Sequence, residues 1–245
     1  MRIGIGITTR NRPDIMRVSS EHHLAFRPAD SKFAIVNDQS EVAYDDVYAR
    51  NLGCDYIVPP ERLGIAKAKN ECLKALSDCD WVFLFDDDTF PCKDGWADAY
   101  ISACERNKVG HLMHLDTVGI VTVKNQLPGG LVTYYQSLGC MLMFSRNALN
   151  ILGGFDKRFN YYGYEHAQMS RRAHAAKLSP DTYTTIAGSG DYIYAMDVRY
   201  HSGGKLPIGE LREPFGEKLS CNDKKQAGEG SNTRAYDDNT IWQGI

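Results

Sequence analysis

The sequence predicts an α/β fold in which helices cover a mainly parallel sheet. Over residues 1–107, apolar strand-like runs alternate with segments of helical spacing at short intervals. Strand and helix alternating in this way are typical of parallel strands joined by helical crossovers. Beyond residue 107 the alternation gives way to shorter apolar runs. We therefore expect a regular first half and a second half of mixed character.

The first half is expected to contain four strands, each followed by a helix. The first strand, residues 3–7, is broken by a polar segment ending at Pro13, and Pro is tolerated in the first turn of a helix that starts near Asp14. Apolar spacing predicts the remaining elements of this half: strands at residues 33–36, 56–58 and 81–85, and helices at residues 42–52, 63–76 and 95–107.

The second half is less regular. A short helix that ends at Gly153 is expected, then a longer helix that opens at Glu165 and a strand that ends at His201. From Lys205 the sequence is rich in Gly, Asn, Asp and Lys, which favours a loop-like tail. The predicted segments of this half are apolar runs at residues 118–123, 131–135 and 140–144, helices at residues 145–152 and 165–177, and a strand at residues 192–200. No repeat or linker is visible, so a single domain over residues 1–245 is expected.

Composition limits the range of functions. The 245 residues are 43% hydrophobic and carry a formal net charge of -3, which provides no overall field for recruiting a polyanion. Nucleic-acid binding is therefore possible but not indicated. Seven cysteines without a C-x-x-C pair, and no signal peptide before the first strand, favour reduced thiols and a cytoplasmic location. No apolar run approaches the length of a transmembrane segment.

Three consecutive carboxylates, Asp86, Asp87 and Asp88, follow the strand predicted at residues 81–85. We call them the acidic triplet. Their mutual repulsion is costly unless a cation, hydrogen-bond donors or water offset it. A divalent metal is one interpretation, and an acidic turn that caps a following helix is the other.

The polar ends of three predicted strands are expected to meet. In a parallel sheet, ligands bind at the carboxyl ends of the strands. Residues 8–12, residues 37–40 and the acidic triplet all occupy such positions. This edge of the sheet is the predicted binding site.

Four separated segments then resemble one known pattern: ITTRNRP at residues 7–13, RLGIAKAKN at residues 62–70, the acidic triplet, and GGFD with YGYE at residues 153–156 and 162–165. Together they resemble the GT-A glycosyltransferases, particularly family 2, over about residues 1–201. The resemblance implies a Rossmann-like nucleotide-binding half with a mixed, mainly parallel sheet (residues 1–110), continuous with an acceptor-binding half (residues 111–204) and followed by the tail (residues 205–245).

The resemblance also implies an activity. A glycosyltransferase of this type moves a sugar from a nucleotide-diphosphate sugar, a UDP-sugar being favoured, to an acceptor hydroxyl, here a glycan by default. Mn²⁺ or Mg²⁺ stabilises the departing diphosphate, and hard oxygen ligands suit either ion. By resemblance Asp88 and Asp86 are metal ligands, with Asp86 also able to contact the donor and Asp87 beside them. His201 is a further candidate ligand, and a hydrogen-bonded strand-end histidine is the alternative.

The donor site implied by the resemblance draws on the loops at the predicted sheet edge and on the segment at residues 62–70. Its residues are Thr8, Arg10, Asn37, Asp38, Arg62, Lys69, Asp86 and Asp87. Lys69 matches the basic residue of the family motif and could reach the diphosphate or the sugar. A solvent-exposed helix face is the alternative for Lys69.

Glu165 and His166 are the catalytic candidates. Family members commonly have Glu-Asp here, with the Asp as the base that deprotonates the acceptor, and this chain has His166 instead. Either an imidazole or the Glu165 carboxylate can act as a general base. The identity of the base, and with it inversion or retention, stays open at the level of sequence.

Other functions are compatible with parts of the sequence. The acceptor could be a hydroxylated DNA base, as for some bacteriophage enzymes, and the fold could serve as a non-catalytic module that binds a sugar nucleotide. A phosphatase of the haloacid dehalogenase type is disfavoured, because Phe90 stands where that class has a small hydroxyl residue.

Overall fold

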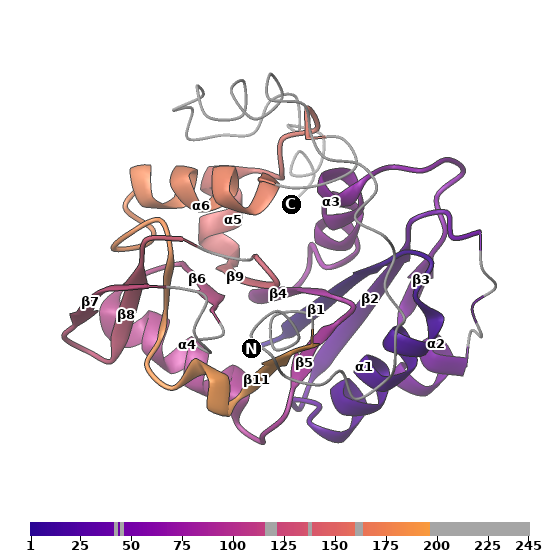
Figure 1. The fold of residues 1–245 in the computed structure, drawn as a ribbon, viewed down its shortest axis with the longest axis horizontal. Coiled ribbons are helices and arrows are strands. Elements are labelled where there is room, and N and C mark those ends of the chain that lie inside the picture. Colours follow the sequence, from indigo (N-terminus) through magenta and orange to yellow (C-terminus); the bar gives the residue numbers. More distant parts are fainter. Residues whose placement is uncertain (42–43, 45–46, 116–121, 137–138, 160–163, 197–245) are drawn as a thin grey trace.

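The centre of the molecule is a six-stranded sheet in the spatial order β3-β2-β1-β4-β9-β6, seen in the computed structural model (Figure 1). Strands β1 to β4 are parallel, and β9 pairs antiparallel with both β4 and β6. The strands are β1 Ile3–Thr9, β2 Ser31–Asn37, β3 Asp55–Ile57, β4 Trp81–Asp86, β6 His111–His114 and β9 Met141–Ser145. The structure describes residues 1–41, 44, 47–115, 122–136, 139–159 and 164–196. The predicted mixed, mainly parallel sheet is confirmed.

The strand order indicates where on the sheet a ligand is expected to bind. From β1 the chain adds β2 and then β3 on one side, and β4 lies on the other. In open α/β sheets, ligands bind outside the carboxyl ends of the strands at the point where the order reverses. That point lies between β1 and β4, and the acidic triplet begins at the end of β4.

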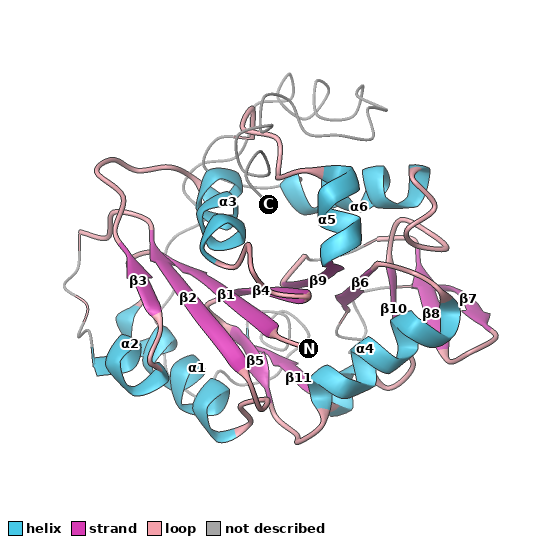
Figure 2. Ribbon diagram, turned by 180° about the vertical axis from the view of Figure 1, so that it is seen from behind, coloured by secondary structure: helices cyan, strands magenta, loops and turns pink. Residues whose placement is uncertain are grey.

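Helices cover both faces of the sheet (Figure 2). One face carries α1 Pro13–Ala25, α2 Val47–Leu52 and α4 Trp96–Asn107, and the other carries α3 Ile65–Ala75, α5 Arg146–Leu152 and α6 Glu165–Ala175. Each layer has its own buried apolar cluster against the sheet. The sheet is therefore apolar on both faces, and its polar groups are concentrated at strand ends.

Glycines on β1 let α3 approach the sheet closely. Ile3, Ile5 and Ile7 fill one face of β1, and Gly4 and Gly6 alternate with them on the other. A Cβ at Gly6 would lie 2.8 Å from the Cys72 Cβ on α3, which is too close for two carbon atoms. The close packing brings the polar residues of α3 next to the end of β4.

Two small sheets complete the fold. One has the order β10-β8-β7, and in the other β11 pairs antiparallel with β5 directly after the acidic triplet. Their strands are β5 Thr89–Pro91, β7 Val123–Leu127, β8 Leu131–Tyr134, β10 Thr184–Ile186 and β11 Ile193–Ala195.

Several sequence predictions need correction. Of the helix predicted at residues 42–52, the structure shows α2 from Val47 to Leu52, and Tyr44 is not helical. Residues 42–43 and 45–46 lie outside the described residues. The strand predicted at residues 192–200 is the shorter β11, and residues 197–200 lie outside the described residues, as do residues 118–121 and the tail. Strand β6 was not predicted, since its two histidines hide the apolar pattern.

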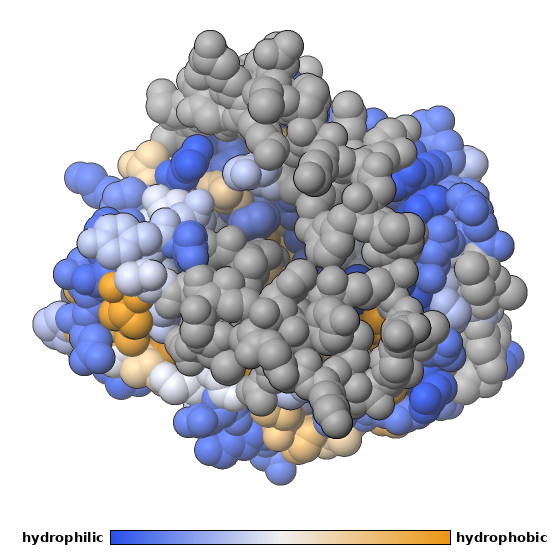
Figure 3. Space-filling model, in the orientation of Figure 1, coloured by the Kyte–Doolittle hydropathy of each residue, from blue (hydrophilic) through white to orange (hydrophobic). Residues whose placement is uncertain are grey.

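The described surface is mainly polar. On the face of the molecule shown in Figure 3, most of the described surface is hydrophilic, and apolar residues occupy only small areas. The exposed large apolar side chains come from separate elements, for example Leu24, Val123 and Ile151. No helix within the described ranges combines the length and apolarity needed to cross a membrane.

Candidate active site

The ends of β1, β2 and β4 meet as predicted. In the strand register Thr8 pairs with both Val36 and Asp86, and Thr9 pairs with Asn37. The Thr8 hydroxyl is buried and has no hydrogen-bond partner among the described residues. One polar edge therefore joins the three predicted loops, and it includes an unsatisfied hydroxyl next to Asp86.

The acidic triplet lies between two strands. Asp86 ends β4 and Thr89 begins β5, so no helix follows, and the helix-cap alternative is wrong. Asp87 and Asp88 are buried, whereas one third of the Asp86 side chain, 33%, is exposed. Buried carboxylates need compensation from nearby donors or cations, and two basic side chains from different elements supply it.

Arg12 is the first of these cations. Its Nη1 lies 3.2 Å from Asp87 Oδ1, and its Nη2 donates to Asp88 Oδ2 at 2.8 Å. The Thr9 hydroxyl donates to the other Asp87 oxygen at 2.6 Å. Burial raises the pKa of Asp87 to about 7, although Arg12 favours its charged form. Arg12 was not among the predicted site residues, and its only sequence signal is its place in the loop after β1.

Lys69 is the second cation. Its Nζ lies 2.9 Å from Glu165 Oε1 and 3.2 Å from Asp86 Oδ1, and its side chain is 2% exposed. The exposed-helix alternative for Lys69 is thus wrong. Burial alone would lower the pKa of Lys69, but Asp86 and Glu165 outweigh it and raise that pKa. Burial raises the pKa of Asp86, with Lys69 opposing the shift.

Glu165 and His166 open α6. Burial disfavours the charged form of Glu165, but Lys69 and His166 outweigh it, and the pKa of Glu165 is far below its ordinary value. The second carboxylate oxygen of Glu165, Oε2, is buried without a hydrogen-bond partner among the described residues. His166 Nδ1 lies 3.7 Å from Glu165 Oε1. The His166 ring also lies over Gly139, where a side chain would overlap it.

Helix α6 is held in place by two buried residues. Arg172 donates to the carbonyls of Leu152 and Gly154 at 2.6 and 2.7 Å, which ties α6 to the glycine turn after α5. His111 on β6 contacts the Ser170 hydroxyl at 2.9 Å. These contacts tie α6 to the glycine turn and to β6, and Lys69 links the first residue of α6 to the last residue of β4.

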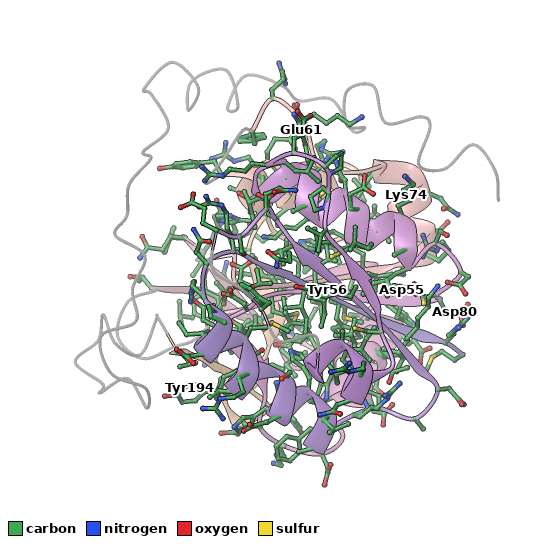
Figure 4. The ribbon with its side chains drawn as sticks, turned by 90° about the vertical axis from the view of Figure 1, so that its right-hand side faces the viewer. Asp55, Tyr56, Glu61, Lys74, Asp80 and Tyr194 are labelled. Atoms are coloured by element: carbon green, nitrogen blue, oxygen red, sulfur yellow. The ribbon has the colours of Figure 1, made fainter. Side chains whose placement is uncertain are left out.

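The residues predicted for the nucleotide pocket mainly organise the loops. The Asp38 carboxylate accepts from the backbone N–H groups of Leu63 and Gly64, at 2.6 and 2.9 Å, and thereby fixes the start of α3. Asn37 donates to the hydroxyl of Tyr56 at 2.8 Å, and Figure 4 marks Tyr56 on the edge strand β3. Both predicted residues lie at the sheet edge, so nucleotide contacts from this edge stay a prediction.

The remaining candidates are spread around this edge. Arg10 pairs with the exposed Glu41 at 3.1 Å. Arg62 lies in the loop before α3 and is partly buried. His201 and the end of its predicted strand lie outside the described residues. The structure therefore brings the acidic triplet, Lys69, Glu165 and His166 together from three chain segments.

The site offers oxygen ligands to a divalent metal. Asp86 and Asp88 are two residues apart at a strand end, and the Asp86 side chain is partly exposed. The unsatisfied Thr8 hydroxyl adjoins them. No cluster of three or more potential metal ligands occurs within the described ranges. A hard cation with two carboxylates, completed by water and a diphosphate, is consistent with this set.

Sequence comparison gives one informative relative, and no family model matches the chain. An uncharacterised glycosyltransferase of Acanthamoeba polyphaga mimivirus is 28% identical over 208 residues, which is 79% of this chain and 80% of the relative.

Solved structures agree on the fold. TarS of S. aureus matches with a TM-score of 0.59 at 16% identity, over 80% of this chain and 36% of that one. The mannosyltransferase PcManGT of Pyrobaculum calidifontis, in complex with GDP-Man and Mn²⁺, matches with a TM-score of 0.54 at 18% identity, over 76% and 56%. GalNAc-T7, with UDP, GalNAc and Mn²⁺, matches with a TM-score of 0.58 at 10% identity, over 71% and 40%.

The chain thus spans less than two thirds of each of these solved structures, and the correspondence is with their common fold. The mimivirus relative, by contrast, is matched over most of its length. The sheet order, the polar edge and both comparisons agree with the resemblance in the sequence motifs. The chain has the GT-A fold, and its sequence is similar to that of a glycosyltransferase.

Proposed function

We propose that the protein transfers a sugar from a nucleotide-diphosphate sugar to an acceptor hydroxyl with the help of a divalent metal. The observation that supports this best is the acidic triplet, which lies at the strand-order reversal next to the basic and catalytic candidates of α3 and α6. UDP is the favoured nucleotide, because TarS and GalNAc-T7 were solved with UDP. The acceptor is proposed to be a glycan.

Asp88 and Asp86 would hold the metal. Mn²⁺ accompanies the nucleotide ligands of PcManGT and GalNAc-T7. When bound, Mn²⁺ or Mg²⁺ would stabilise the negative charge that develops on the departing diphosphate. Thr8, Arg10, Asn37, Asp38 and Arg62 would then border the nucleotide, since they surround the same edge.

His166 is the stronger candidate for the base. Glu165 is held as a carboxylate by Lys69, and its lowered pKa makes it a weak proton acceptor. His166 is next to it, and an imidazole accepts a proton near neutral pH. Glu165 would then position His166 and the first turn of α6. Its Oε2, which has no hydrogen-bond partner in the described part of the chain, would accept from a sugar hydroxyl.

Thermal-shift and turnover measurements test this function together. A donor that binds the folded state raises the melting temperature, so a panel of UDP- and GDP-sugars with and without Mn²⁺ should give one or more metal-dependent shifts. We expect Asp88→Asn to lose the shift and the turnover. His166→Ala should keep the shift and lose about a hundredfold or more in rate.

Asp94→Asn is the matched control, because Asp94 is an exposed carboxylate in the loop after β5. It should behave as wild type in both assays. Donor-induced shifts in melting temperature without sugar transfer to any glycan, or to DNA with hydroxymethylated bases, would favour a non-catalytic binding module. No shift with any nucleotide sugar would contradict the proposed function.

A further inference from the structure

Arg12 contacts two neighbouring carboxylates through different nitrogens. Nη1 lies against Asp87 and Nη2 against Asp88, with 19% of the Arg12 side chain exposed. The backbone N–H of Arg12 donates to the Tyr44 hydroxyl at 2.7 Å, and this hydroxyl also contacts Thr9 at 2.8 Å. The loop after β1 is thus anchored so that the guanidinium faces the acidic triplet.

Arg12 is a shared partner of the two carboxylates. Asp87 is bonded through one oxygen to Arg12 and through the other to Thr9, the last residue of β1. Asp88 accepts a 2.8 Å bond from Arg12, and the hydroxyl of the adjacent Thr89 donates to its other oxygen at 3.2 Å. If Arg12 lost its bond to Asp88, its guanidinium would therefore still contact Asp87.

The balance of charges around the acidic triplet favours the binding of a further cation. Four carboxylates, those of the acidic triplet and of Glu165, face two basic groups, Arg12 and Lys69. Like charges at this spacing repel one another, so the cluster favours additional positive charge. Lys69 is fully buried between two partners, whereas Arg12 is partly exposed. Arg12 is therefore the more solvent-exposed of the two cations.

We propose that Arg12 is the resident counter-ion of Asp88 in the metal-free protein and that a divalent metal takes Asp88 from it. Asp87 keeps hold of the guanidinium while Asp88 turns to the metal. Arg12 therefore sets the metal affinity of the site by competing for one of its ligands. This inference rests on the proposed metal-dependent function, and it assigns to Arg12 a role that the donor-site residues do not have.

Binding of Mn²⁺ alone tests the competition without any turnover. Free Mn²⁺ is measured by electron paramagnetic resonance at constant ionic strength for wild type, Arg12→Met and Arg12→Lys. Removing a fixed positive charge beside a metal ligand should lower the Kd of Arg12→Met for Mn²⁺ by at least about fivefold. Arg12→Lys keeps a charge but not the two-pronged contact, so its Kd should lie between the other two.

Two further variants make the outcome specific. Arg17→Met removes the same charge from α1, where Arg17 pairs with Glu21 at the surface, and its Kd should equal that of wild type. Asp88→Asn combined with Arg12→Met should abolish the tight binding. Equal or weaker Mn²⁺ binding by folded Arg12→Met would overturn the inference, as would tight binding that survives Asp88→Asn. If Arg12→Met does not fold, the Kd of Arg12→Lys decides in the same way.

The failure of the inference and that of the proposed function are distinguishable. Tighter Mn²⁺ binding by Arg12→Met, with no nucleotide sugar stabilising any variant, supports the role of Arg12 and contradicts the donor assignment. A metal-dependent donor shift with unchanged Mn²⁺ affinity in Arg12→Met supports the donor assignment and overturns the role of Arg12. No Mn²⁺ binding by either protein overturns both the metal site and the competition.

Discussion

Two charge clusters meet at the end of β4, and they are compensated in different ways. Asp86 and Glu165 share the buried ammonium of Lys69, which comes from α3. Asp87 and Asp88 share the partly exposed guanidinium of Arg12, which comes from the loop after β1. We infer two different roles. Lys69 holds the end of β4 and the start of α6 together, whereas Arg12 can be replaced at Asp88 by a metal ion.

Replacing Lys69 should have the largest effect on stability. Lys69→Met leaves two carboxylates facing each other without their shared cation, and breaking a buried ion pair in this way costs about 3–5 kcal/mol of unfolding free energy. Chemical denaturation measures the loss. Lys74→Met is the control, since Lys74 lies exposed on the same helix (Figure 4) and should change stability by less than about 0.5 kcal/mol.

A second substitution, at Glu165, should restore stability to the Lys69→Met variant. In Lys69→Met with Glu165→Met, the unpaired buried carboxylate of α6 is removed, so much of the lost stability should return. If Lys69→Met were as stable as Lys74→Met, Lys69 would not stabilise the contact between the end of β4 and the start of α6. If the double variant were less stable than Lys69→Met, the loss would have a cause other than the uncompensated Glu165.

Asp87 and Glu165 should change the unfolding free energy with pH in opposite directions. This effect is expected to be smaller than the loss of Lys69. The pKa of Asp87 is raised to about 7 in the folded protein, compared with about 4 for an ordinary Asp. Between these values the folded state holds the extra proton, so this group's contribution to stability is lost as pH rises toward 7. The lowered pKa of Glu165 acts in reverse, and its contribution is lost only below about pH 4.

Unfolding free energies measured between pH 4.5 and pH 7.5, a range set by about those two pKa values, test the Asp87 side. Asp87→Asn should remove part of the decline in stability with rising pH that wild type shows, and Asp94→Asn should leave the profile unchanged. A profile for Asp87→Asn parallel to that of wild type would show that Asp87 does not titrate in this range.

The fold was predictable where local patterns are strong. The apolar runs of β1, β2 and β4 end in polar residues, and their carboxyl edges meet as expected. Strand β6 was missed because buried histidines look polar in sequence, although His111 is satisfied by the Met143 carbonyl and the Ser170 hydroxyl. The three-residue strand β10 is too short to produce a pattern.

The sequence motifs pointed to candidate residues but not to the contacts that these residues make. Lys69 was selected as a donor-binding residue, yet its burial depends on Glu165, which lies 96 positions later in the chain. Arg12 was not selected, because a single arginine in a loop has no periodicity and its partners are 75 and 76 positions away. Contacts of this range are set by tertiary packing, which the motifs do not encode.

The most direct test of these two roles observes both Arg12 and Lys69 in one titration with Mg²⁺. In ¹⁵N-labelled protein, Mg²⁺ is added while the Arg12 Nε–H signal, assigned with Arg12→Lys, and the Lys69 Nζ signal are recorded by NMR. We expect the Arg12 signal to shift with saturating behaviour and the Lys69 signal to stay in place. Mg²⁺ binding that leaves Arg12 unchanged, or that shifts Lys69 instead, would contradict the account.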